Sequence, residues 1–77
     1  MKDTDLSRLR DGERALVTGI QEEGPMGRRL RDMGLVRGTA VRRLFGSPFG
    51  DPAAFLVRGA VVALRRTDSR RVRVRLL

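Results

Sequence analysis

Few side chains in this sequence could carry out covalent chemistry. The 77 residues include no cysteine and no histidine, so neither a thiolate nor an imidazole is present as nucleophile, base or metal ligand. The serines and threonines therefore lack an imidazole that could activate them, and the adjacent carboxylates Glu22 and Glu23 are expected to be solvated in a loop. No carboxylates have metal-ligand spacing. The sequence predicts a protein that is not an enzyme, with no catalytic residue, cofactor or metal site.

Arginine is the residue type that remains for recognition. The chain carries 17 basic and 9 acidic residues, for a net charge of +8. Residues 1–36 sum to zero, whereas residues 37–77 hold ten arginines against Asp51 and Asp68. Such a charge distribution favours an acidic partner, which could be nucleic acid, anionic lipid or an acidic protein. A GC-rich genome also produces arginine-rich chains, so composition alone does not select the partner.

The most clearly marked element that could present these side chains is a helix starting at Pro25. Proline is favoured at the first helical position, and Gly24 before it is an acceptable N-cap. Gly34 is expected to end the helix in the left-handed conformation. Helical spacing places three apolar residues on one face, which we expect to cover a core: Met26, Leu30 and Met33.

The rest of the chain reads as short strands separated by glycine-rich or proline-rich turns. A single helical turn is expected around Leu6 and Leu9, and another is capped by Thr67–Ser69. Gly19 is expected to mark a bulge or a close backbone approach, and a bend or bulge is expected between Val41 and Leu44. The predicted strands are Glu13–Ile20, Thr39–Phe45, Ala54–Arg58, Val61–Arg66 and Arg71–Leu77, with a tight hairpin at Gly59-Ala60.

Five short strands with one short helix after the first predict a mainly β fold, a small SH3-like five-stranded barrel, because closure removes exposed sheet edges. Residues 1–77 are expected to form a single domain of this type. Phe45 and Phe55 are expected in the core, and Phe49 is expected to be exposed at a loop tip. The residues predicted to be buried are Val17, Leu30, Val41, Phe55, Val57, Leu64 and Val72.

The N-terminus is charged and leads into no apolar stretch, so no signal peptide is predicted. The longest apolar runs, 53–57 and 60–64, are too short to span a bilayer. We therefore expect a cytoplasmic protein without direct membrane insertion.

The order of several short motifs resembles the FeoA family. The matching residues include Met33-Gly34-Leu35 with Gly38, then Gly50-Asp51-Pro52 and Val57-Arg58-Gly59, and the resemblance runs from about Leu6 to Leu76. Arg37 departs from it, since the family often has proline there. The resemblance implies an SH3-like domain. It also implies a non-catalytic accessory or regulatory protein of bacterial ferrous iron uptake, which would bind the cytoplasmic part of a GTP-binding membrane ferrous iron transporter. The family is also associated with transition metal ion binding.

We expect the partner to contact the loop Gly46–Pro52. Phe49 is the candidate apolar anchor there, because exposed aromatic residues are frequent hot spots. The predicted charged rim consists of Arg42 and Arg43 beside the loop and Arg28 and Arg31 on the helix. Weak self-association is left open. The alternative function is a nucleic-acid-binding SH3-like barrel that uses the arginine-rich second half, but the absence of Tyr and Trp leaves few stacking platforms and makes nucleic acid the less favoured partner.

Overall fold

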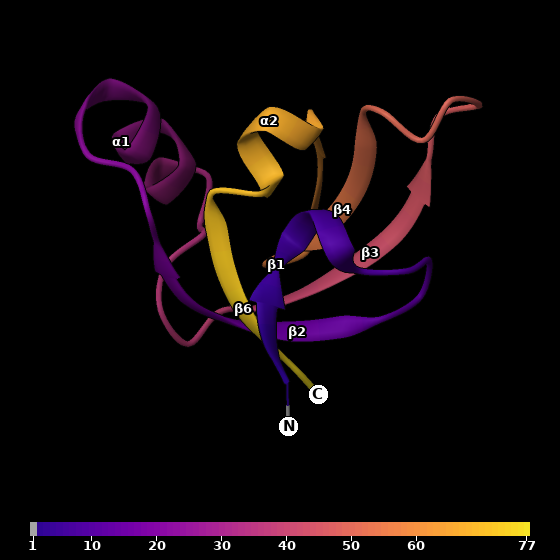
Figure 1. The fold of residues 1–77 in the computed structure, drawn as a ribbon, viewed down its shortest axis with the longest axis horizontal. Coiled ribbons are helices and arrows are strands. Elements are labelled where there is room, and N and C mark those ends of the chain that lie inside the picture. Colours follow the sequence, from indigo (N-terminus) through magenta and orange to yellow (C-terminus); the bar gives the residue numbers. More distant parts are fainter. Residues whose placement is uncertain (1) are drawn as a thin grey trace.

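Six antiparallel strands form one curled sheet in the computed structural model, which describes residues 2–77 (Figure 1). The strand order is β1-β6-β2-β3-β4-β5. The sheet does not close into a complete barrel, since its two outermost strands, β1 and β5, pair with β6 and β4 respectively and not with each other. The elements in chain order are β1 (Asp3–Asp5), the 3₁₀ turn η1 (Leu6–Arg8), β2 (Arg14–Ile20), α1 (Gly24–Asp32), β3 (Ala40–Gly46), β4 (Ala53–Val57), β5 (Ala60–Leu64), α2 (Arg66–Ser69) and β6 (Val72–Leu76).

The predicted mainly β fold is confirmed, but the sheet has a sixth strand within the described residues. The sequence Asp3-Thr4-Asp5 was not predicted as a strand because aspartate disfavours extended structure. It forms β1 by pairing with β6, in a register that places Asp3 opposite Arg75 and Asp5 opposite Arg73. Cross-strand pairs of opposite charge stabilise this register.

Of the alternatives predicted for Gly19 and for Val41–Leu44, the structure shows a bulge in both cases, the second at the end of its predicted segment, and this second bulge corrects the placement of Phe45. The β2–β6 register shifts between Val17 and Gly19, and the β3–β4 register shifts between Arg43 and Phe45. The extra residue in β3 reverses the alternation of side chains beyond it. Phe45 therefore lies on the outer face opposite Ala54, with 59% of its surface exposed, and the prediction that it belongs to the core is wrong.

The inner face of the sheet holds one hydrophobic core. All seven residues predicted to be buried are buried, and they pack with leucines of the first turn and of the α1–β3 connection. Met26 and Met33 of α1 are partly buried against this core, and Leu30 between them is fully buried. The helix stripe predicted from spacing is therefore confirmed. Gly34 ends the helix with φ +98°, a conformation that glycine adopts without a Cβ penalty.

Two local details of the second half differ from the sequence prediction. The β4–β5 hairpin turns at Arg58-Gly59, one residue earlier than predicted, with φ values of +51° and +80° that correspond to a type I′ turn. The short helix α2 is not capped by its own residues. Instead, the Arg66 N–H donates to Oδ1 of Asp51 at 2.9 Å, so a carboxylate from the β3–β4 loop satisfies the first free amide of α2.

No helix among residues 2–77 is both long and apolar enough to cross a membrane.

Candidate partner-binding surfaces

The β3–β4 loop presents Phe49 to solvent. This side chain is 94% exposed, which agrees with its predicted place at the loop tip. The loop is held by its own hydrogen bonds: the Ser47 N–H donates to the Pro52 carbonyl at 3.0 Å, and the Gly50 N–H donates to the Ser47 carbonyl at 2.7 Å. Asp51 connects the end of the loop to α2. The fold therefore offers an exposed aromatic ring on a braced loop, a suitable anchor for a protein partner.

Arg42 and Arg43, predicted as rim residues beside this loop, have different environments. Arg42 is exposed on the outer face of β3, opposite Leu56. Arg43 points to the other side of the strand, where its Nε lies 2.7 Å from Oδ1 of Asp11 and only 15% of its side chain is exposed. The role of Arg43 seen in the structure is to hold the turn before β2, and its predicted partner-binding role has little exposed surface to act through.

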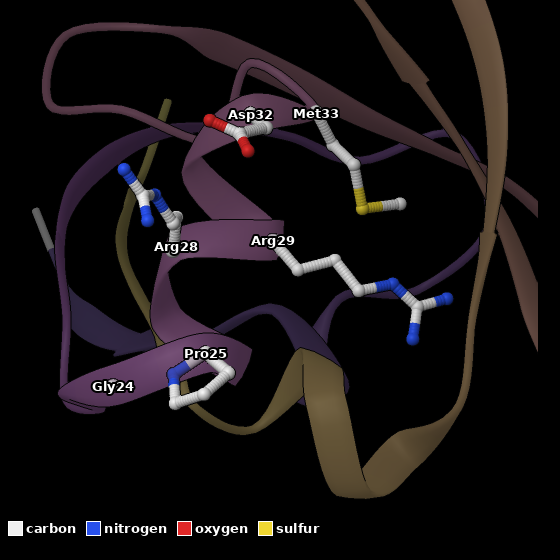
Figure 2. A pocket seen from close by; sticks show the side chains of 6 residues that line it. All are labelled: Gly24, Pro25, Arg28, Arg29, Asp32 and Met33. Atoms are coloured by element: carbon white, nitrogen blue, oxygen red, sulfur yellow. The ribbon is translucent and has the colours of Figure 1, made fainter.

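The outer side of α1 forms a second candidate surface (Figure 2). A shallow depression of about 640 Å³ is bordered by Arg28, Arg29 and Asp32, with Pro25 at the start of the helix and Met33 at its end. Figure 2 shows Arg29 and Met33 extending along one side of the helix and Arg28 and Asp32 along another. A mixture of apolar side chains, here Pro25 and Met33, with charges of both signs is typical of the rim of a protein interface.

Arg31 does not point into this depression but helps to position the helix. Its Nη2 donates to the Glu22 carbonyl at 3.3 Å. Gly27, which is buried, lies against the same carbonyl, and a Cβ at this position would overlap the Glu22 oxygen and lie 3.0 Å from the Glu22 carbonyl carbon. The segment before the helix can therefore pack closely only because residue 27 has no side chain. This constraint could not be predicted from the sequence, because a glycine inside a helical pattern does not show which atoms pack against it.

The predicted partner-binding residues do not form one surface. Figure 1 shows α1 and the β3–β4 loop at opposite ends of the longest axis of the molecule, which measures 31 Å. Phe49 is therefore separated from Arg28 and Arg31 by the width of the sheet. One large partner could contact both ends, but a short segment could reach only one of them.

Ion pairs in the fold connect the basic second half of the sequence to carboxylates of its neutral first half. Within residues 2–77, four ion pairs join an arginine of the second half to a carboxylate of the first. Three of them lie around β6, where Arg71, Arg73 and Arg75 pair with Glu22, Asp5 and Asp3 at 3.6, 3.9 and 2.9 Å, and the fourth is the Arg43–Asp11 pair described above. The hydrogen bond from Arg75, together with its charge, lowers the pKa of Asp3 below its usual value of 3.8. The arginines of β6 are thus largely neutralised.

The described residues contain no group of three or more His, Cys, Asp or Glu side chains that could hold a metal ion. A small polar depression of about 150 Å³ lies between η1, α2 and the β3–β4 loop. Among its polar side chains, Ser7, Asp51 and Ser69 already make hydrogen bonds within the protein. The features of the described residues that stand out are the exposed loop and the outer side of α1.

The curled sheet, the helix over one end of the core and the braced loop at the other define a small SH3-like β-domain. A family model described as the FeoA domain matches residues 4–76. The chain belongs to the FeoA family, which takes part in ferrous iron transport.

Solved structures support the same assignment. An FeoA-like protein from Clostridium acetobutylicum is 32% identical with a TM-score of 0.91, and the match covers 100% of this chain and 90% of that chain. FeoA from Stenotrophomonas maltophilia, solved in complex with zinc and described as a prokaryotic SH3 domain protein, is 33% identical with a TM-score of 0.84, over 94% of this chain and 89% of that one.

A curated relative places such a domain in a much larger protein. The Fe(2+) transport protein A/Fe(2+) transporter FeoB fusion protein of Porphyromonas gingivalis (strain ATCC BAA-308 / W83) is 29% identical over 72 residues. The match covers 94% of this chain but 8% of the relative's length. The present chain thus corresponds to one small part of that protein.

Proposed function

We propose that this protein is a non-catalytic accessory factor of ferrous iron uptake that binds the cytoplasmic part of a GTP-binding membrane Fe²⁺ transporter. The observation that carries the proposal is the fusion relative, in which a domain similar to this chain shares a polypeptide with an Fe(2+) transporter. Covalent linkage keeps two domains at a high effective concentration. Where the two are separate chains, a binding surface must supply the association that the linker supplies in the fusion protein.

The contact surface that we favour is the β3–β4 loop. Phe49 is 94% exposed, and an aromatic ring held at a braced loop tip loses little conformational entropy when a partner covers it. Arg42 on the neighbouring strand supplies positive charge toward an acidic surface. The α1 surface with Arg28 is the second contact candidate, and the separation of the two ends allows each to be tested independently.

The test is binding of the purified 77-residue protein to the transporter in nanodiscs made of neutral lipid, measured in the GTP-bound, GDP-bound and nucleotide-free states. We expect wild-type protein to bind in at least one state, and Phe49→Ala to weaken binding at least tenfold, as for a hot spot contributing about 1.4 kcal/mol or more. Arg28→Gln tests the α1 surface, and Arg70→Gln is the matched control because Arg70 is an exposed arginine of the same charge directly after α2.

The possible outcomes test the accessory function and the choice of contact surface separately. Absence of binding by the wild-type protein in every nucleotide state would contradict the accessory function. Binding of Phe49→Ala with wild-type affinity, together with a loss in Arg28→Gln, would assign the contact to α1 instead of the loop. The isolated protein is expected to hydrolyse no GTP, while GTP turnover by the transporter is expected to change when the protein is added.

The alternative, a nucleic-acid-binding barrel, rests on the arginine-rich second half. Four of its ten arginines are paired with carboxylates in the structure, which reduces the charge available for phosphates. Nucleic-acid binding through several arginines would weaken steeply with salt, by about 0.9 log units per neutralised phosphate for each decade of salt concentration. A salt titration with a duplex probe separates this function from binding to the transporter.

A further inference from the structure

The outer face of the sheet carries arginines that the ion pairs leave uncompensated. Two neighbouring depressions of about 320 and 430 Å³ lie over the start of β3, and both are bordered by Ala40 and Arg58. Arg14 and Arg42 line the first depression and Arg37 lines the second. No carboxylate of residues 2–77 lines either one, and none of the four arginines forms an ion pair with a described carboxylate.

The same face continues into exposed apolar side chains. Residues directly opposite one another on neighbouring strands share a face of the sheet. One such row crosses four strands and changes from basic to apolar: Arg14, Arg42, Leu56 and Val61. The next row on this face contains Phe45, Ala54 and Ala63.

The apolar part of this face is accessible. Val61 is 63% exposed and Phe45 is 59% exposed, although both are large apolar residues that most folds would cover. The bulge in β3 is the reason that Phe45 lies here, since without it the ring would point into the core. We call the surface formed by Arg14, Arg42, Arg58, Phe45, Leu56 and Val61 the outer sheet face.

We propose that the outer sheet face binds the surface of an anionic membrane. Arginines beside exposed aliphatic and aromatic side chains match a bilayer interface, where anionic headgroups attract the cations and the acyl boundary accepts the apolar groups. Nucleic acid would be complementary to the arginines but would leave Val61 and Leu56 without favourable contacts. The choice of a membrane over an acidic protein rests on the proposed function, because a partner of a membrane transporter works next to the lipid surface.

The rest of the molecule is consistent with one-sided attachment. The arginines of β6 are paired with carboxylates on β1 and before α1, so they attract anionic lipid weakly. Arg66 of α2 borders a depression shared with Ala53 and Leu64 of the inner face, so α2 lies on the opposite side of the sheet. The outer sheet face therefore combines arginines that form no ion pair within residues 2–77 with large exposed apolar side chains.

The test is co-sedimentation of the 77-residue protein with vesicles of phosphatidylcholine alone or of phosphatidylcholine mixed with phosphatidylglycerol, without any transporter. We expect binding to the mixed vesicles only, and weakening with added salt as the Debye length falls from about 10 Å toward 3 Å. The double variant Arg14→Gln/Arg42→Gln should lower the partition coefficient about 30-fold, because each arginine near an anionic surface contributes about fivefold. Phe45→Ser and Val61→Ser should each lower it several-fold without changing the net charge.

The matched control is Arg66→Gln/Arg70→Gln, which removes the same charge from α2 and the residue directly after it. We expect it to retain far more binding than the outer-face variant. Equal loss in the two double variants would overturn the proposal in favour of a nonspecific effect of net charge, and so would absence of binding to the mixed vesicles at low salt. A duplex DNA probe bound more tightly than the vesicles, and lost in Arg14→Gln/Arg42→Gln, would assign the face to nucleic acid.

The transporter assay in neutral-lipid nanodiscs keeps this proposal distinct from the proposed function. Vesicle binding without transporter binding would support the membrane face and contradict the accessory function. Transporter binding in neutral lipid that is lost in Arg14→Gln/Arg42→Gln, without vesicle binding, would reassign the outer sheet face to an acidic protein surface.

Discussion

Replacing Gly27 with alanine should destabilise the protein, which is the opposite of the usual effect of this change in a helix. In an exposed helix interior, alanine is favoured over glycine by about 1 kcal/mol. At Gly27, however, the new Cβ would overlap the carbonyl oxygen of Glu22 and lie 3.3 Å from Nη1 of Arg31. The sign of the stability change therefore depends on whether the clash exceeds the gain in helix propensity.

The identity of the clashing atom decides this comparison. A backbone carbonyl cannot move by changing a rotamer, so the segment before α1 or the first turn of the helix must shift. Overpacking of this kind costs about 1–3 kcal/mol. The shift would also weaken the hydrogen bond from Arg31 to the same carbonyl. Because the Cβ would overlap a backbone atom, we take the upper half of this range, about 2–3 kcal/mol. Subtracting the favourable term of about 1 kcal/mol leaves a net loss of about 1–2 kcal/mol, which corresponds to a decrease in Tm of about 4–16 °C for a domain of this size.

Gly19→Ala provides the matched control. No atom lies within 4 Å of a Cβ built at Gly19, and this residue does not have a positive φ. Alanine there should leave stability unchanged or raise it by up to about 1 kcal/mol, since glycine in a strand is entropically unfavourable. Thermal unfolding followed by circular dichroism compares the two variants. If Gly27→Ala were as stable as the wild type or more stable, the close packing of α1 against Glu22 would not be a constraint and the argument would be refuted.

Three further predictions concern the core, the termini and the metal. Leu64→Ala should destabilise the protein by about 2–5 kcal/mol by leaving a cavity, because Leu64 is buried in the core; chemical denaturation would measure it, and a change below 1 kcal/mol would contradict the packing. The lowered pKa of Asp3 means that its ion pair with Arg75 stabilises the fold above the unfolded-state pKa and is lost as the pH falls through the folded-state pKa; a carboxyl NMR titration should show this pKa returning toward 3.8 in Arg75→Gln, and an unchanged value would exclude Arg75 as the cause. Anaerobic titration calorimetry with a ferrous salt should show no tight binding, because imidazole and thiolate ligands are missing; stoichiometric binding at micromolar affinity or better would contradict this prediction.

The parts of the fold that were predicted correctly depend on local patterns. Alternation in residues 71–77 places Val72 and Val74 on the inner face of β6, and the spacing of Met26, Leu30 and Met33 defines the inner side of α1. Periodicity reports which face of an element is apolar, and in a small domain only one face can be buried. This is why the core residues could be listed from the sequence alone.

The features that the sequence did not predict correctly depend on contacts between residues that are distant in the chain. A one-residue bulge in β3 places Phe45 on the outer face. A sequence pattern indicates only the approximate position of a bulge, so it does not determine the face on which the side chains beyond the bulge lie. The strand Asp3–Asp5 forms because β6 supplies opposite charges. The cap of α2 comes from Asp51, 15 residues earlier in the chain. Each of these depends on a partner whose position is set by the completed sheet.

In the candidate site, too, the features set by local sequence were predictable and the features set by the sheet topology were not. The exposure of Phe49 was predictable, because a loop with two prolines and two glycines in seven residues cannot bury much of itself. Its distance from Arg28 and Arg31 was not predictable, because the sheet topology places α1 and the loop at opposite ends (Figure 1). Arg43 was expected at the rim because it lies beside the loop, as Arg42 does, but adjacent residues in a strand point to opposite faces, and Arg43 pairs with Asp11.

The position of the free positive charge follows from the way the ends of the chain are held together. The neutral first half and the basic second half suggest a molecule with two differently charged ends, but β1 and β6 lie side by side and their charges pair. The excess charge therefore remains on arginines outside these pairs, which include those on the outer side of β2 and β3 and at the β4–β5 turn. Arg75→Gln would break the Asp3–Arg75 pair and lower the net charge of the chain by one unit without changing this face. Removing Arg42 would change the same net charge and remove one of the few uncompensated cations beside exposed apolar groups. Binding that depends on net charge cannot distinguish these two variants, whereas binding that depends on the outer sheet face must.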